Sequence, residues 1–228
     1  MRRVARGRST CWTEIRGAAA GDTEARAHFV TAYTPVIRAY LLARWRGSPL
    51  AQSVDDAMQE VFLSCFREGG VLDRADPERP GGFRAFLYGV ARNVARGVER
   101  TAGRRREQRL QTNFEAPASD EPSERAFDRA WAVAILREAG QSQERAARAA
   151  GADAARRVEL LRLRFEEGLP IREIAERWNA EPAHLHHEYA RARREFRDAL
   201  IATMLFHHPD SRQGAWDEAR RLLGLLAG

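Results

Sequence analysis

The stretch GLPIREIAERWNAEPAHLHHEYARARREFR, residues 168–197, decides the fold. Apolar residues recur at helical spacing from Ile171 to Trp178 and again after Pro182. Asn179, a residue type that tolerates a left-handed backbone, lies between the two periodic segments. The stretch therefore predicts a short helix, a tight turn and a longer helix that starts at Pro182.

The longer helix has one apolar face and several basic ones. Its expected inward residues are Leu185, Tyr189, Ala192, Phe196 and Leu200. The other faces carry His184, His186, His187, Arg191, Arg193, Arg194 and Arg197. A short helix followed by a basic helix is the layout of a helix-turn-helix that lays its second helix in the major groove. By position, we expect the three histidines to reach base edges and the arginines at 191, 193 and 194 to contact phosphates.

The rest of the chain is also predicted to be helical, because no segment has a strand pattern. Helical apolar stripes predict helices over 23–45, 54–67 and 83–106. Pro35 falls inside the first, where we expect a kink or two pieces. Ser53 and Asp56, spaced like a capping box, are expected to start the second. The fold class is therefore all-α.

A row of arginines runs along the third predicted helix. Arg92, Arg96, Arg100 and Arg104 recur at steps of four, which places their side chains along one face. Between residues 92 and 109 there are seven arginines and two acids. Such a density favours a nucleic-acid contact over an ordinary solvated face.

Composition divides the chain into two small helical domains. Residues 112–124 are acidic, contain two prolines and lack an apolar period, which predicts a flexible linker. The expected organisation is an N-terminal extension over 1–20, a first domain over 21–111 and a second over 125–206. Residues 207–228 form a tail with a short amphipathic helix.

Bulk composition narrows the function classes. The 228 residues carry a net charge of +6, and all 38 basic residues are arginine, which favours a polyanionic partner. Two distant cysteines indicate a reducing, cytoplasmic setting. No apolar run is long enough for a signal peptide or a membrane span, so we expect no membrane insertion. The chain has no phosphate-binding loop, nucleophile elbow or metal signature, so we expect no enzyme activity and no cofactor.

Three segments together resemble the bacterial sigma factors of the extracytoplasmic-function type, over about residues 13–200. DDAMQEVFLSCF, residues 55–66, resembles the helix with which that family binds the polymerase clamp. FRAFLYGVARNVARGVERTAGRRR, residues 83–106, resembles its promoter-melting segment. LLRLRFEEGLPIREIAERW with ARARREFR resembles its C-terminal promoter-recognition domain. Their order, on either side of a linker, makes the resemblance specific.

The resemblance implies a subunit of RNA polymerase that directs transcription initiation at a subset of promoters. Its partners would be core RNA polymerase, promoter DNA and an anti-sigma protein. The residues expected to bind polymerase are Asp55, Asp56, Gln59, Glu60 and Phe62. Those expected at the minus-ten element are Arg84, Tyr88, Arg92, Asn93, Arg96 and Arg100. The minus-thirty-five element would be contacted by the histidines and arginines of the second basic helix.

Some residues depart from the family pattern and keep other hypotheses open. His186 and Glu188 stand where family members commonly carry lysine or arginine, and Glu188 would repel phosphate. A degenerate sigma-like protein that binds a regulator without DNA, or a conventional helix-turn-helix regulator, are the alternatives. A zinc site at the histidines, or a catalytic cluster of Asp55, Asp56 and Glu60, is a weaker hypothesis.

Overall fold

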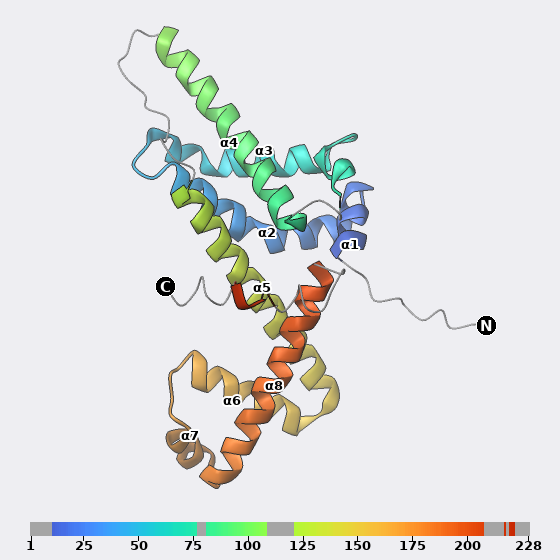
Figure 1. Cartoon of the computed structure of the whole chain (residues 1–228), viewed down its shortest axis with the longest axis vertical. Helices are drawn as coiled ribbons and strands as arrows, with labels where there is room; N and C mark the ends of the chain where they lie inside the picture. The colour runs from blue at the N-terminus through green and yellow to red at the C-terminus, as the bar shows by residue number, and fades with distance from the viewer. Residues whose placement is uncertain (1–10, 77–80, 109–120, 208–216, 218, 222–228) are drawn as a thin grey trace, which may run out of the picture. The chain divides into compact units, whose positions relative to one another are not determined.

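The computed structural model describes residues 11–76, 81–108, 121–207, 217 and 219–221. Within these ranges the protein is all-α, as predicted, and contains no strand (Figure 1). The helices are α1 (Cys11–Ala19), α2 (Thr23–Arg44), α3 (Val54–Phe66), α4 (Gly82–Gln108), α5 (Glu121–Ala150), α6 (Ala152–Phe165), α7 (Ile171–Trp178) and α8 (Pro182–His207). Two short 3-10 helices, η1 (Pro49–Ser53) and η2 (Val71–Arg74), flank α3.

The predicted helices are present, with ends that differ by one or two residues. Pro35 lies inside α2, and the helix continues through it, so of the two expected alternatives, a kink or two pieces, the second is wrong. The capping box at Ser53 is also wrong, since its side chain makes no capping hydrogen bond. Ser53 ends η1 with φ −94° and ψ 9°, whereas a capping side chain needs an extended backbone.

The chain divides into two compact units. Unit 1 comprises Met1–Ala134, Phe206–Pro209 and Arg220–Gly228, and unit 2 comprises Ile135–Leu205 and Asp210–Ala219. Two compact helical units were predicted, but the boundary between them lies inside α5 and not at residue 125.

Helix α1 belongs to the core of unit 1. Trp12, Ile15 and Ala18 are buried, and the Trp12 ring meets the edge of Phe83 at 5.8 Å between centroids. Arg26 of α2 joins this helix to the rest, because its guanidinium donates to the carbonyl oxygens of Ala18 and Phe66. Residues 11–19 are therefore part of the folded unit, and the predicted extension over 1–20 is wrong for them.

The first half of α5 completes the same core. Phe127 and Trp131 are fully buried, although the sequence assigned them to the second domain. The Trp131 ring stacks on Tyr33 at 5.6 Å, and the Phe127 ring meets Tyr40 edge-on at 6.3 Å. Both partners lie on α2, beside which the start of α5 runs (Figure 1). Long-range aromatic packing, which no local pattern reveals, moved this segment into unit 1.

Unit 2 is built around the turn between α7 and α8. Its core joins α6, α7 and α8 through Leu160, Leu163, Ile171, Ile174, Ala175 and Leu185. Asn179 has φ 47° and ψ 51°, and its N–H donates to the carbonyl oxygens that end α7. The predicted left-handed break at Asn179 and the start of a helix at Pro182 are confirmed.

Some predictions fall outside the described residues. Most of the linker over 112–124 does, and residues 121–124 form the first turn of α5. Most of the tail over 207–228, including Leu222, Leu223 and Leu226, lies outside too. None of the helices in the described part of the chain is long and apolar enough to cross a membrane.

Candidate nucleic-acid interface

The exposed face of α4 is basic. Leu87, Ala91 and Ala95 are fully buried on its inner side. The outer side exposes Asn93, Arg96, Arg100 and Arg104, with Arg92 half-buried. Steps of four residues give these guanidiniums a rise of about 6 Å each along a slowly winding strip. The predicted arginine row is therefore a largely exposed surface between residues 92 and 104 of the helix.

Glu99, the acid within this row, is withdrawn from the surface. Its side chain is 8% exposed and accepts hydrogen bonds from Arg44 Nε at 2.6 Å and Nη2 at 2.9 Å. The indole Nε1 of Trp45 donates to the same carboxylate at 2.9 Å. A bidentate buried pair of this kind fixes α4 on the end of α2. It also leaves the outer face of α4 between residues 92 and 104 without an exposed acid.

Two predicted minus-ten residues are engaged elsewhere in unit 1. Arg84 forms an ion pair with Asp128 of α5. The Tyr88 ring packs edge-on against Tyr40 at 5.5 Å and against Phe127 at 5.4 Å. Tyr88 is therefore half-buried in the aromatic core and is not presented as a stacking platform for a base. In this structure Arg84 is thus held by Asp128 and Tyr88 by aromatic rings, and their contact with nucleic acid stays a prediction.

The predicted polymerase-binding residues lie on α3, mostly exposed. Asp55, Asp56, Gln59 and Glu60 are all on the surface, and Asp55 is ion-paired with Arg38 of α2. Phe62 differs, since its ring is half-buried beside Phe29, Phe66 and the α2 surface.

Leu63 was missed by the sequence analysis and is 56% exposed. It follows Asp56 by seven residues and Glu60 by three, so it shares their helix face. The sequence did contain a signal for this exposure, because Leu63 falls outside the apolar stripe that is buried in α3.

The basic side chains of α8 are exposed but do not share one face. His187, Arg191 and Arg194 are spaced by four and three residues and therefore form one strip. His186 and Arg193 lie on the adjoining strip, where the Arg193 guanidinium covers the Tyr189 ring at 5.7 Å. Within the first strip, Arg191 has its Nε 3.4 Å from Glu195 Oε1, and it also lines a hollow beside His184. The structure thus divides the six predicted residues into a central strip and flanking ones.

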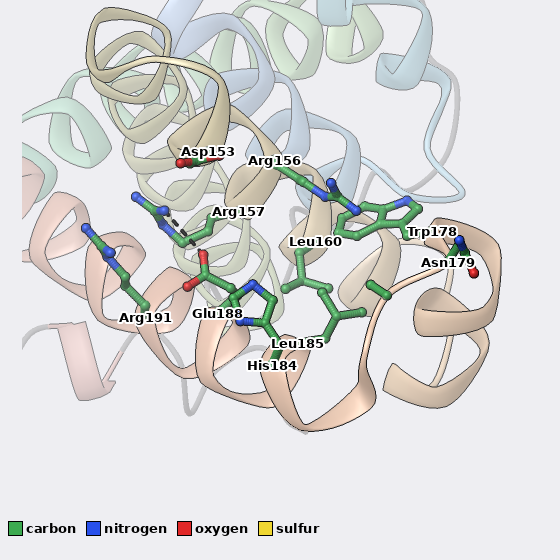
Figure 2. Close-up of a pocket in the computed structure, with 11 residues that line it drawn as sticks. Asp153, Arg156, Arg157, Leu160, Trp178, Asn179, His184, Leu185, Glu188 and Arg191 are labelled. Carbon is green, nitrogen blue, oxygen red and sulfur yellow. Dashed lines mark hydrogen bonds and ion pairs between the residues drawn. The ribbon is translucent and has the colours of Figure 1, made fainter.

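His184 is on a third side, in a hollow of about 360 Å³ between α6, the turn and the start of α8 (Figure 2). Arg156 of α6 lines this hollow with its guanidinium 4.6 Å from the Trp178 ring centroid. Arg156 was not predicted, because only the fold brings α6 to the turn. The hollow mixes Arg156 and Arg191 with Asp153 and Glu188, so no single ligand charge is favoured there.

Glu188, which the sequence suggested would repel DNA, is paired inside unit 2. Figure 2 shows its carboxylate directed at Arg157, whose Nη1 lies 3.3 Å from it. Arg157 is 6% exposed and also donates from Nε to both oxygens of Glu195 at 3.0 Å. Hydrogen bonding to Glu195 raises the pKa of Arg157 above its usual value, with Glu188 adding to the effect. The charge of Glu188 is therefore balanced by a buried cation.

Acidic and histidine side chains do not gather into a metal-binding arrangement anywhere in the described part of the chain. The zinc hypothesis concerned His184, His186 and His187 together with His207 and His208, and His208 lies outside the described residues. No protein-family model matches the chain, and no curated protein matches it. What the interface can do follows from charge, exposure and helix geometry.

Proposed function

We propose that this protein is a sigma factor of the extracytoplasmic-function type, which binds core RNA polymerase and directs it to a subset of promoters. The observation that carries the proposal is the pair of exposed arginine-bearing helix faces, one on α4 and one on α8. In both, the neighbouring acid is paired with a buried arginine: Glu99 with Arg44, and Glu188 with Arg157. Each unit thus offers a cationic face suited to phosphates.

In unit 1 the strip on α4 would hold the separated strand of the minus-ten element. A melted strand needs a row of cations along its backbone and polar groups for base edges. Arg96, Arg100 and Arg104 supply the cations, and Asn93 supplies an amide on the same helix. Base stacking would have to come from elsewhere, because Tyr88 is packed against α5.

In unit 2 the central strip of α8 would enter the major groove of the minus-thirty-five element. His187 is near the helix start, where side chains of a recognition helix reach base edges. Arg191 and Arg194 follow one and two turns later and would hold phosphates. Asn179 and the buried core below it set the angle at which α8 leaves the turn.

The face of α3 would bind the polymerase clamp. Asp56, Glu60 and Leu63 give this face an exposed apolar residue for a partner to bury and acids beside it for charge complementarity. An anti-sigma protein that covers this face and the strip on α4 would hold the protein inactive. The proposal implies a cytoplasmic protein without a cofactor or a catalytic residue.

The experiment that tests the proposal is transcription in vitro with purified core polymerase and a library of genomic fragments. Discrete start sites that share two upstream elements are the expected result. Arg96→Gln combined with Arg100→Gln should abolish transcription while core binding persists. Arg46→Gln combined with Arg67→Gln removes the same charge from other exposed positions of unit 1 and is the matched control. Asp56→Arg should block core binding itself.

Two outcomes contradict the proposal. Core binding without any transcript would favour the interaction protein, although Glu188, one of the two residues that suggested it, is now explained by Arg157. Tight binding of promoter duplex without any affinity for core would instead favour a conventional helix-turn-helix regulator.

A further inference from the structure

Two arginines of unit 1 meet at one carboxylate. Arg84, near the start of α4, donates to Oδ1 of Asp128 on α5. Arg221, from the C-terminal segment of the same unit, has its Nη1 3.4 Å from Oδ2. Each oxygen of Asp128 therefore faces a different guanidinium, and the Asp128 side chain is only 13% exposed.

The backbone that carries Asp128 is held in place independently of these ion pairs. Phe127 and Trp131, immediately before it and three residues after it, are fully buried among aromatic rings. Burial of such large apolar side chains stabilises the attachment of this part of α5 to α2 and α4. The carboxylate is thus fixed over Arg84 by packing, and its exchange for another anion requires only that the side chain turns away.

Arg84 stands at the beginning of the arginine strip on α4. Tyr88 and Arg92 follow it at steps of four, and the exposed Arg96 and Arg100 continue the series. Along this strip Arg84 has its guanidinium neutralised by an acid from another helix. A carboxylate and a phosphodiester present the same kind of planar or forked oxygen acceptor to a guanidinium.

We propose that Arg84 and Arg221 form a binding site for the phosphodiester backbone of single-stranded DNA, which Asp128 occupies in the free chain. The identity of the ligand rests on the function proposed above. A DNA strand that lies along α4 exchanges its phosphate for the carboxylate, while Phe127 and Trp131 keep α5 attached. Asp128 thereby lowers the affinity of the free chain for non-specific nucleic acid.

The test compares Asp128→Asn with Glu124→Gln in the full-length protein. Both variants remove one negative charge from the first half of α5, and Glu124 is exposed one turn earlier. Binding of a fluorescent 20-nucleotide single-stranded DNA is followed by anisotropy across a salt series. Each additional phosphate contact steepens the slope of log affinity against log salt by about 0.7 for single strands.

Asp128→Asn is expected to steepen the slope by about 0.7 to 1.4 relative to Glu124→Gln, since one or two arginines become available to phosphate. Adding Arg84→Gln to Asp128→Asn should remove at least half of that gain. Equal slopes in Asp128→Asn and Glu124→Gln, or a gain that survives Arg84→Gln, would overturn the proposal.

A second neutral variant guards against a failure of folding. Asp128→Ser should give the same slope as Asp128→Asn, and near-ultraviolet circular dichroism of the aromatic cluster should match the parent in both. The anisotropy assay contains no polymerase, so it separates this proposal from the previous one. If the protein supports transcription but Asp128→Asn and Glu124→Gln have equal salt slopes, only the role of Asp128 is overturned. If Asp128→Asn has the steeper salt slope but the protein does not bind core polymerase, only the sigma assignment is overturned.

Discussion

At the scale of single residues, the fold changes the effect that several acidic side chains have on the local surface charge. Glu99 and Glu188 each reduce the local positive charge when the sequence is counted, yet both are paired with buried arginines. Asp128 does the opposite, because it carries an acid from a distant segment to Arg84. Net charge within a sequence window is therefore a poor guide to the surface potential of these helices.

Glu188→Gln tests this interpretation of α8. Because Arg157 retains Glu195, the variant should lose only about 0.5–1 kcal/mol of stability and bind duplex DNA within about twofold of the parent. Urea unfolding and anisotropy measure the two quantities. Glu181→Gln, an exposed residue just before α8, is the matched control. Severalfold tighter duplex binding by Glu188→Gln alone would show that its charge does face the DNA.

The thiol of Cys65 predicts a dependence of stability on alkaline pH. Burial raises its pKa from 9.0 to about 12, so the folded chain holds this proton where the unfolded chain releases it. The contribution is complete below about pH 9 and is lost as pH rises toward 12. The free energy of unfolding should fall by about 2 kcal/mol more in the parent than in Cys65→Ala between pH 8.5 and 10.5. Parallel pH profiles would contradict this.

At the scale of elements, the attachment of α4 to α2 depends on one buried pair. Replacing Glu99 with alanine leaves the guanidinium of Arg44 and the indole N–H of Trp45 without their acceptor. The expected loss is about 3–5 kcal/mol in urea unfolding, and Glu68→Ala, at an exposed acid of the same unit, should change little. Combining Glu99→Leu with Arg44→Met should recover most of the loss. A loss below about 1 kcal/mol in Glu99→Ala would show that water replaces the carboxylate.

Elements that depend on local patterns were predictable from the sequence. The stripe of α3 and the break at Asn179 follow from side-chain period and backbone preference, and both are present. The cap at Ser53 failed because the preceding residues form η1, which places Ser53 in the wrong backbone conformation. The exposed strip on α4 was predictable for the same local reason, since burial of Leu87 and Ala91 dictates what faces outward.

At the scale of the whole molecule, α5 was assigned to the wrong unit over its first half. Nothing in the order of Phe127 and Trp131 says which apolar surface they meet, because any amphipathic helix fits several cores. The contacts with Tyr33, Tyr40 and Tyr88 connect positions far apart in the chain. The partners of Arg84 and Arg156 could not be predicted from the sequence either, because they come from other helices.

Trp131→Ala distinguishes the two assignments. It should cost about 3–5 kcal/mol, because a large buried ring is removed from the core of unit 1. Hydrogen exchange measured by mass spectrometry should show lost protection in α2 and α4, with α7 unchanged. Loss of protection in α6 and α7 instead would return the segment to the second unit, as the sequence alone suggested.

The division of α5 between two cores also has a consequence for how the protein can diverge. Phe127 and Trp131 are constrained by rings on α2 and α4, whereas the second half of the helix is constrained by unit 2, where Gln143 donates to the carbonyl of Ala192. Among descendants of this gene, substitutions before residue 135 should covary with α2 and α4, and later ones with α8. Recombination at the middle of α5 would therefore keep both sets of contacts, whereas a crossover near residue 125 would separate Phe127 and Trp131 from the rings that they contact on α2 and α4.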